Sequence, residues 1–194
     1  MNLIFFIKSA SVDLSKYTIK DPQGSSGRID VISRCILSAL LRDNCFEENV
    51  QIWVFLDKYG TFIFKSDLLN YLTFPKNEIM LTDYFVKLIL NKKLENPLNS
   101  VIKSEEGIIE FLKKFIKSDY EIFILSETGQ NFSKHSEKLN SKKDLLFVIG
   151  NQSGAFLESK ELLALNLPML SLGTQSYLAS SVIRLIKLHV FSKI

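Results

Sequence analysis

Cysteine and histidine are scarce in this chain, with only two of each among its 194 residues. Cys35 and Cys45 stand alone rather than in the closely spaced pairs of a zinc site, and His135 and His189 are equally isolated. We therefore expect neither a structural metal site nor a scaffold built on disulfides. With so few imidazoles, catalysis by histidine also has few candidates.

Common phosphate-binding and hydrolytic motifs are absent. The chain has no GxxxxGK[ST] loop, and its first apolar run is not followed by GxGxxG. Neither HExxH nor GxSxG is present, and no Ser-His-Asp order stands out. These absences argue against the usual hydrolase mechanisms.

Long apolar runs are missing as well. The opening MNLIFFIK is too short for the core of a signal peptide, and no cationic segment precedes its apolar run. No window approaches the roughly 18 apolar residues of a membrane span. We expect a soluble, reduced, cytoplasmic protein with no membrane partner.

Composition is ordinary for a globular protein, with 46% hydrophobic and 23% charged residues. The length fits a single domain over residues 1–194, and ENPLNS, residues 95–100, is the best candidate for an internal boundary. A net charge of +3 permits contact with nucleic acid without requiring it.

Apolar runs alternate with helical patterns along the chain. We expect strands over residues 2–7, 50–57, 121–126 and 145–150, with TFIFK as a hairpin partner of the second, and helices over residues 29–41, 81–94, 105–117, 160–165 and 177–190. Ser159 would cap the fourth helix. This alternation predicts an α/β fold with a mostly parallel sheet flanked by helices.

The region from Asp144 to Phe191 carries the clearest pattern for ligand binding. Gly150 and Gly173 each end an apolar run, and residues 126–129 form a third expected turn. Ligands collect at the carboxyl ends of parallel strands, where these turns should meet. The alternative is that the glycines only close tight turns.

A second pattern, QGSSGRIDVISRC, spans residues 23–35. Ser25 and Ser26 are possible helix caps, and Asp30 would lie in the first turn. Arg28 and Arg34 bring two guanidinium groups near a helix start, which suits an RNA phosphate. An ordinary capped helix with solvated arginines is the alternative.

These passages together resemble the archaeal-type tRNA pseudouridine N1-methyltransferases, the TrmY family of the SPOUT superfamily. Family members carry a stretch like DLPGSxGRLDVLCRC, matched here by DPQGSSGRIDVISRC at residues 21–35. IGNQSG, residues 149–154, partly matches their Gly-Asp-His-x-Gly motif, and SLGT, residues 171–174, matches their closing motif. The resemblance covers nearly the whole chain.

The resemblance implies a deep trefoil knot in the C-terminal part, a homodimer, and S-adenosyl-L-methionine (SAM) as cofactor without a metal. It implies that SAM is held mostly by backbone groups. Carried over by position, the cofactor-binding residues are Leu125, Gly150, Leu172, Gly173, Thr174, Gln175, Ser176, Tyr177 and Val182.

The implied reaction is methyl transfer to N1 of pseudouridine at position 54 of tRNA. Asp30 is the candidate proton acceptor, although a first-turn carboxylate has a purely structural alternative; Arg28 and Arg34 are the candidate RNA contacts. Asn151, Thr174 and Val182 depart from the family's usual aspartate, proline and cysteine. Two other hypotheses therefore stay open: a SPOUT methyltransferase acting on another RNA such as ribosomal RNA, and a non-catalytic RNA-binding or assembly factor.

Overall fold

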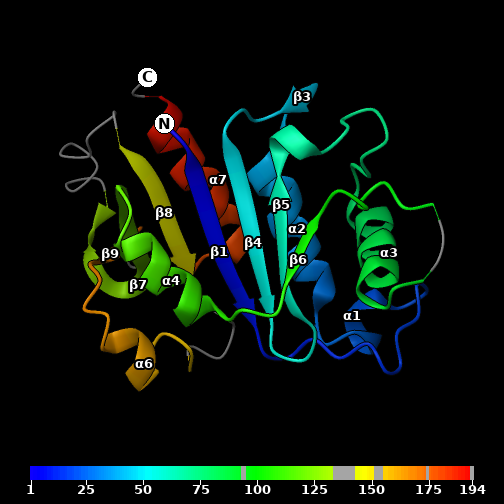
Figure 1. Ribbon diagram of the computed structural model, residues 1–194, viewed down its shortest axis with the longest axis horizontal. Coiled ribbons are helices and arrows are strands. Elements are labelled where there is room, and N and C mark those ends of the chain that lie inside the picture. Colours follow the sequence, from blue (N-terminus) through cyan, green and yellow to red (C-terminus); the bar gives the residue numbers. More distant parts are fainter. Residues whose placement is uncertain (93–94, 133–142, 151–154, 174, 193–194) are drawn as a thin grey trace.

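A seven-stranded sheet forms the centre of the protein (Figure 1). The computed structural model describes residues 1–92, 95–132, 143–150, 155–173 and 175–192. In spatial order the strands are β6 (Ile102–Ser104), β5 (Gly60–Lys65), β4 (Val50–Leu56), β1 (Leu3–Ser9), β8 (Asp144–Ile149), β7 (Tyr120–Asn131) and β9 (Met169–Ser171). The strands from β4 to β9 run parallel to one another, whereas β5 pairs antiparallel with both β4 and β6. The predicted mostly parallel sheet and the β4–β5 hairpin are confirmed.

Helices connect most of these strands. They are α1 (Pro22–Ser25), α2 (Ile29–Leu40), α3 (Glu78–Ile89), α4 (Ile108–Ile116), α6 (Lys160–Leu163) and α7 (Ala179–Phe191), with a 3-10 turn η1 at Ser66–Leu68. A small hairpin, β2 (Leu41–Arg42) and β3 (Cys45–Phe46), follows α2. Among the described residues, no helix is both long and apolar enough to cross a membrane.

Capping explains why α3 starts before the predicted position. The Asn77 side chain accepts a hydrogen bond from the Met80 amide at 2.9 Å, so the helix starts at Glu78 rather than at Leu81. Its end is also earlier than residue 94, because Asn91 adopts the left-handed conformation with φ of 50°. Ser159 does occupy the N-cap position of α6, but its side chain makes no capping hydrogen bond there.

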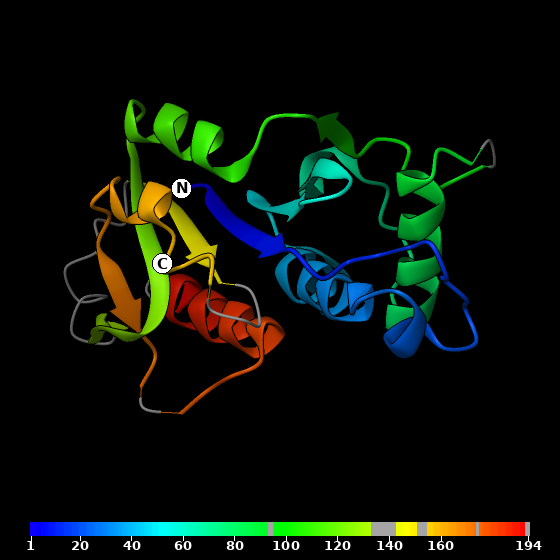
Figure 2. The ribbon, with the colours of Figure 1, turned by 90° about the horizontal axis from the view of Figure 1, so that it is seen from below.

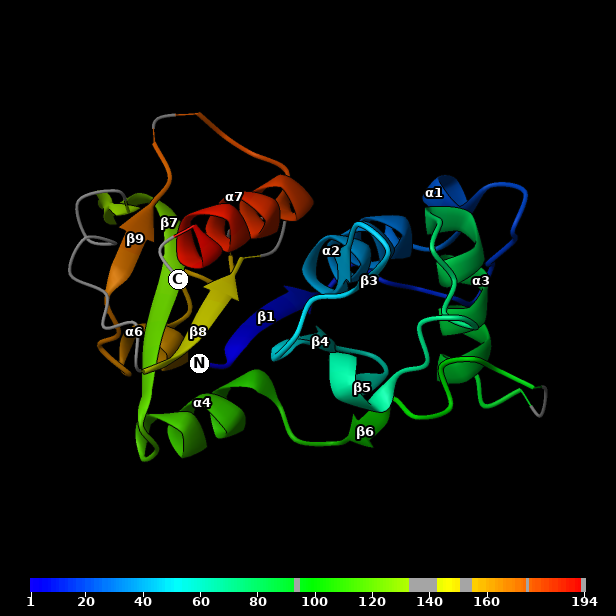
Figure 3. The ribbon, with the colours of Figure 1, turned by 90° about the horizontal axis from the view of Figure 1, so that it is seen from above.

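Alternation along β1 divides the apolar core between the two faces of the sheet. Leu3, Phe5 and Ile7 face α2, α3 and α7, whereas Ile4 and Phe6 face α4 and α6. Figures 2 and 3 show α4 on one side of the sheet and α2 and α7 on the other. The sheet is therefore covered on both faces, as its apolar strands require.

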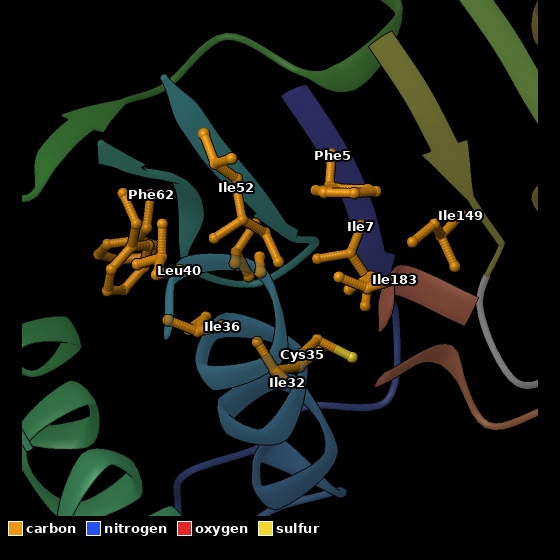
Figure 4. Close-up of a cluster of buried hydrophobic side chains, with 14 of the residues drawn as sticks. Phe5, Ile7, Ile32, Cys35, Ile36, Leu40, Ile52, Phe62, Ile149 and Ile183 are labelled. Atoms are coloured by element: carbon orange, nitrogen blue, oxygen red, sulfur yellow. The ribbon is translucent and has the colours of Figure 1, made fainter. Parts of the chain in front are cut away.

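Two helices on the same face start at the carboxyl edge of the sheet. Because α2 connects the parallel strands β1 and β4, its first turn lies at the end of β1. Ile183, near the start of α7, lies beside Ile7 and Ile149 at the ends of β1 and β8 (Figure 4). Lys187, one turn further on, contacts the last turn of α2. Both helix N-termini are thereby directed to the edge where ligands bind in parallel sheets.

The contact between α7 and α2 is a buried cation. The Lys187 ammonium donates hydrogen bonds to the carbonyls of Ser38, Ala39 and Leu41 at 3.1, 2.9 and 3.0 Å. Its Nζ also lies 3.2 Å from Glu47 Oε2. Burial lowers the pKa of Lys187, although Glu47 opposes that shift. Lys187 therefore closes the C-terminal end of α2 and holds α7 beside it.

Candidate cofactor and RNA site

Strand register brings the predicted cofactor loops together. Leu125 of β7 is paired with Ile149 on one side and with Leu170 on the other. Gly150 directly follows Ile149, and Leu172 lies two residues after Leu170. Three chain segments distant in sequence thus meet at the carboxyl edge of β8, β7 and β9.

The prediction of a turn at residues 126–129 is wrong. These residues belong to β7, which continues to Asn131, and the register shifts so that Leu170 pairs with both Leu125 and Gln130. A Cβ atom at Gly129 would lie 2.6 Å from the backbone nitrogen of Leu170. Only a glycine permits this approach of the two strands. The irregularity lies directly beside the strand that leads into the cofactor loop.

The loop after β9 is fixed at its first residues. The Ser171 hydroxyl accepts a hydrogen bond from the Gly173 amide at 3.2 Å and donates one to the Gly173 carbonyl at 3.0 Å. Gly173 has φ of +127°, and nothing lies within 4 Å of an added Cβ atom. Gly173 is therefore required by its positive φ angle and not by close packing, because the space around it is open.

The other predicted cofactor residues differ in exposure. Gln175, Ser176 and Tyr177 are exposed, whereas Leu172 and Val182 are partly buried against the core. Gly150 leaves room for Leu157, whose Cδ1 would be 2.7 Å from an added Cβ atom. Thr174 and Asn151 lie outside the described residues.

The start of α2 is pressed against the end of β1. Gly27 has φ of +60°, and a Cβ atom there would lie 1.8 Å from the Ser11 carbonyl oxygen. The Ser11 hydroxyl donates to the Gly27 carbonyl at 2.8 Å. Arg28 follows in the left-handed conformation with φ of 73°. Sequence patterns did not indicate Ser11, because its role depends on a contact between segments.

The two predicted caps behave differently. The Ser26 hydroxyl accepts a hydrogen bond from the Ile29 amide at 3.2 Å, but the N-cap of α2 is Arg28, which makes no side-chain capping hydrogen bond. Ser26 therefore contacts the start of the helix without being its N-cap. The Ser25 hydroxyl instead accepts from the Thr18 amide at 2.9 Å and stabilises the preceding loop. The prediction was wrong for Ser25, because its hydroxyl binds the Thr18 amide instead of an amide in the first turn of α2.

Asp30 is the centre of a buried charge network. Only 1% of the residue is exposed, and Arg28 binds it in a bidentate way, with Nε–Oδ1 at 3.1 Å and Nη2–Oδ2 at 3.2 Å. Arg34 Nη2 contacts Asp30 Oδ2 at 3.1 Å, and Arg34 Nε lies 3.1 Å from Glu78 Oε2. The hydrogen bonds to Asp30 raise the pKa of Arg28 above its ordinary value.

Both guanidinium groups still reach solvent. The side chain of Arg28 is 39% exposed and that of Arg34 is 31% exposed. A cavity of about 270 Å³ lies nearby and is lined by Lys20, Asp21, Pro22, Gln23, Asp30, Glu78, Ile79 and Thr82. This lining includes neither arginine, but it includes Asp30 and Glu78, the carboxylates that the arginines contact. The exposed parts of the two guanidinium groups, rather than this cavity, can therefore offer fixed cations to an anionic partner.

Metal-binding groups do not gather in the described part of the chain, where no cluster of three or more His, Cys, Asp or Glu residues could hold an ion. Cys35 and Cys45 are free thiols.

Comparison with known proteins gives relatives over nearly the full length. The tRNA (pseudouridine(54)-N(1))-methyltransferase of Thermococcus onnurineus (strain NA1) is 25% identical over 189 residues, covering 91% of this chain and 90% of the relative. The protein of the same name from Pyrococcus abyssi (strain GE5 / Orsay) is 25% identical over 199 aligned positions, covering 96% of each.

A solved structure shows the same fold. Archaeoglobus fulgidus Nep1, crystallised with S-adenosylhomocysteine, superposes with a TM-score of 0.63 at 18% identity, covering 99% of this chain and 98% of that chain. The model of a family described as "Putative SAM-dependent RNA methyltransferase" matches residues 2–193. The chain therefore belongs to this family of SAM-dependent RNA methyltransferases.

Proposed function

We propose that this protein transfers a methyl group from SAM to N1 of pseudouridine at position 54 in the T-loop of tRNA. The names of the relatives from Thermococcus and Pyrococcus support this target, and family membership supports the cofactor. The observation that carries the proposal is the common sheet edge. There, the backbone around Leu125, Gly150 and Leu172 lies on the same side as the first turn of α2 with Arg28.

The cofactor would be held by Leu125, Gly150, Leu172, Gly173, Thr174, Gln175, Ser176, Tyr177 and Val182. The open surroundings of Gly173 fit this role, because a ligand can approach the backbone closely there. Backbone N–H and C=O groups can pair with the polar edge of an adenine. When bound, SAM supplies an electrophilic methyl group. These residues bind and orient, and orientation alone accounts for much of the rate in such transfers. A trefoil knot at this end of the chain is part of the proposal.

Arg28 and Arg34 are proposed to bind the RNA. Each is partly exposed while fixed from behind by Asp30, so little side-chain freedom is lost on binding. N1 of pseudouridine carries an imide-like proton that must leave, and negative charge then develops on the ring carbonyls. Fixed guanidinium donors can stabilise that charge.

Asp30 remains the candidate proton acceptor, but its contacts favour a second role. Both carboxylate oxygens already accept hydrogen bonds from guanidinium groups. We therefore propose that Asp30 mainly positions Arg28, and that a water molecule held at the site takes the proton. The effect of an Asp30→Asn substitution on the pH profile separates these roles.

A homodimer is proposed through α7. Leu178, the N-cap of α7, and Leu188 near its C-terminal end are 63% and 65% exposed, and Tyr177, which precedes Leu178, is 41% exposed. This is more apolar surface than a solvated helix needs. Light scattering coupled to size exclusion tests this directly. The cytoplasm is proposed as the compartment, since two free thiols suit reducing conditions.

Nucleoside mass spectrometry of separated RNA fractions tests the function. Purified protein is incubated with SAM and with tRNA or ribosomal RNA lacking the modification. N1-methylpseudouridine in the tRNA fraction alone is expected. Product confined to ribosomal RNA favours the alternative target, and no product in either fraction, with SAM binding intact by calorimetry, favours a non-catalytic RNA-binding protein.

A further inference from the structure

A second cavity lies at the far end of α3, and the described residues that line it include no carboxylate. It measures about 310 Å³ and is lined by Lys87, Leu88, Asn91, Lys92, Asn96, Asn99 and Lys103. We propose that this cavity, here called the α3 lysine pocket, binds a backbone phosphate of the tRNA at a distance from the methyl-transfer site. The inference rests on the proposed function, which makes RNA the substrate.

Two positive charges in the pocket have no opposing carboxylate among the described residues. Lys87 Nζ lies 2.5 Å from Asp83 Oδ2, so its charge is balanced within α3. Lys103 donates only to neutral oxygens, the Leu88 carbonyl at 2.9 Å and Asn91 Oδ1 at 2.5 Å. Neither Lys103 nor Lys92 makes an ion pair within the described ranges of the chain. The pocket therefore has about two uncompensated charges available for an anion.

Lys103 is held in place for such a contact. An ammonium group has three donors, and two are used by Leu88 and Asn91. These partners belong to the C-terminal end of α3, whose partial negative charge offsets only part of the ammonium charge. One N–H remains for a guest, and the ordered side chain loses little freedom on binding.

The rim of the pocket is fixed as well. Asn96 is 8% exposed; its Nδ2 donates to the Tyr84 carbonyl at 2.8 Å, and its Oδ1 accepts from the Leu98 amide at 2.9 Å. Asn99, which is exposed, adds an amide group to the lining. Lysine ammonium and asparagine amide groups are common donors to RNA phosphates.

The place of the pocket indicates a backbone contact rather than a base contact. The first turn of α3 carries Glu78, which binds Arg34 and lines the 270 Å³ cavity. The last turn carries Lys87 and Leu88 of the lysine pocket. A helix of 12 residues is about 18 Å long. One nucleotide cannot span that distance, but the arm of a tRNA can.

A kinetic comparison of two RNA substrates tests the inference. Full-length tRNA and a T-arm stem-loop that is too short to reach the pocket are methylated by wild type and by the variant Lys92→Ala/Lys103→Ala. For the variant, we expect the KM for full-length tRNA to rise about 5–20-fold, with unchanged KM for the stem-loop and for SAM. The slope of log K against log salt should become shallower by about 0.7–0.9 for each phosphate that the variant no longer binds.

A control variant on another surface and a second pocket variant complete the test. Lys113→Ala/Lys117→Ala, on α4 and at its C-cap, removes two exposed lysines from the opposite face of the sheet and should change neither KM. Lys92→Glu leaves the Lys103 contacts with α3 intact, so it tests the pocket if the double variant is unstable. An unchanged KM for full-length tRNA in both pocket variants overturns the inference while leaving the proposed function standing. If wild type methylates neither substrate, the proposed function itself fails.

Discussion

Arg28 and Asp30 are joined by two parallel hydrogen bonds, Nε–Oδ1 at 3.1 Å and Nη2–Oδ2 at 3.2 Å. The carboxylate is buried, whereas the guanidinium reaches solvent. This asymmetry places the cation, and not the carboxylate, where a substrate can touch it. Substitutions in this pair can therefore distinguish a role of Asp30 in positioning Arg28 from a role in accepting the proton.

Asp30→Asn should keep the fold but weaken the hold on Arg28, because an amide cannot accept two guanidinium groups as a carboxylate does. We expect the kcat/KM for tRNA to fall about 10–100-fold, with an unchanged shape of the pH–rate profile. Arg28→Lys, which removes the bidentate geometry, should reduce kcat/KM to a similar extent. A profile whose acidic limb disappears in Asp30→Asn would instead identify Asp30 as the proton acceptor.

Gly129→Ala should disturb the cofactor edge without touching a ligand. The new Cβ atom would meet the Leu170 backbone at 2.6 Å, and backbone atoms cannot move aside as a flexible side chain can. We expect a loss of about 1–3 kcal/mol in the free energy of unfolding and a weaker affinity for SAM, measured by denaturation and calorimetry.

Gly107→Ala is the matched control. Its nearest neighbour is the end of the Glu110 side chain, which can rotate away. A change below about 1 kcal/mol and an unaltered SAM affinity are expected. Equal losses of stability and SAM affinity in both variants would show that the close approach of β7 and β9 at Gly129 does not matter for the cofactor edge.

The two thiols should differ in reactivity. Burial raises the pKa of Cys35 to about 12, whereas Cys45 is exposed. Iodoacetamide at pH 8 should add one label to the native protein, at Cys45, and two after denaturation. Peptide mass spectrometry that finds rapid native labelling of Cys35 would contradict the packing of α2 against the sheet.

Asp144 should contribute stability that is lost in acid. Burial alone would raise its pKa, but the hydrogen bonds from Asn2 and Tyr120, together with the charge of the N-terminus, outweigh burial and lower the pKa below its ordinary value. Because the folded value is depressed, this contribution is complete above the unfolded pKa and disappears as the pH falls through the folded pKa. Asp144→Asn should therefore flatten the fall in unfolding free energy below about pH 4. Urea titrations at pH 2–7 measure this, and parallel curves for the two proteins would refute it.

Local sequence patterns predicted the long buried strands β1, β4 and β8 and the helix α2, because the burial of β1 and the apolar face of α2 depend on neighbouring residues. They did not predict the short strands β2, β3 and β6. The Asp30–Arg34 pair also follows from i, i+4 spacing on a helix. Glu78, Lys187 and the shifted pairing of Leu125 and Gln130 were not predictable in this way. Each depends on contacts between segments brought together only by the folded sheet.

The sharpest test of the proposed function is methylation of a T-arm stem-loop that carries either pseudouridine or uridine at position 54. Purified protein and SAM are incubated with each RNA, and the nucleosides are identified by mass spectrometry. We predict N1-methylpseudouridine from the first RNA and no methylation of the second. Methylation of both RNAs, or of a different nucleotide in the stem-loop, would contradict the proposed function.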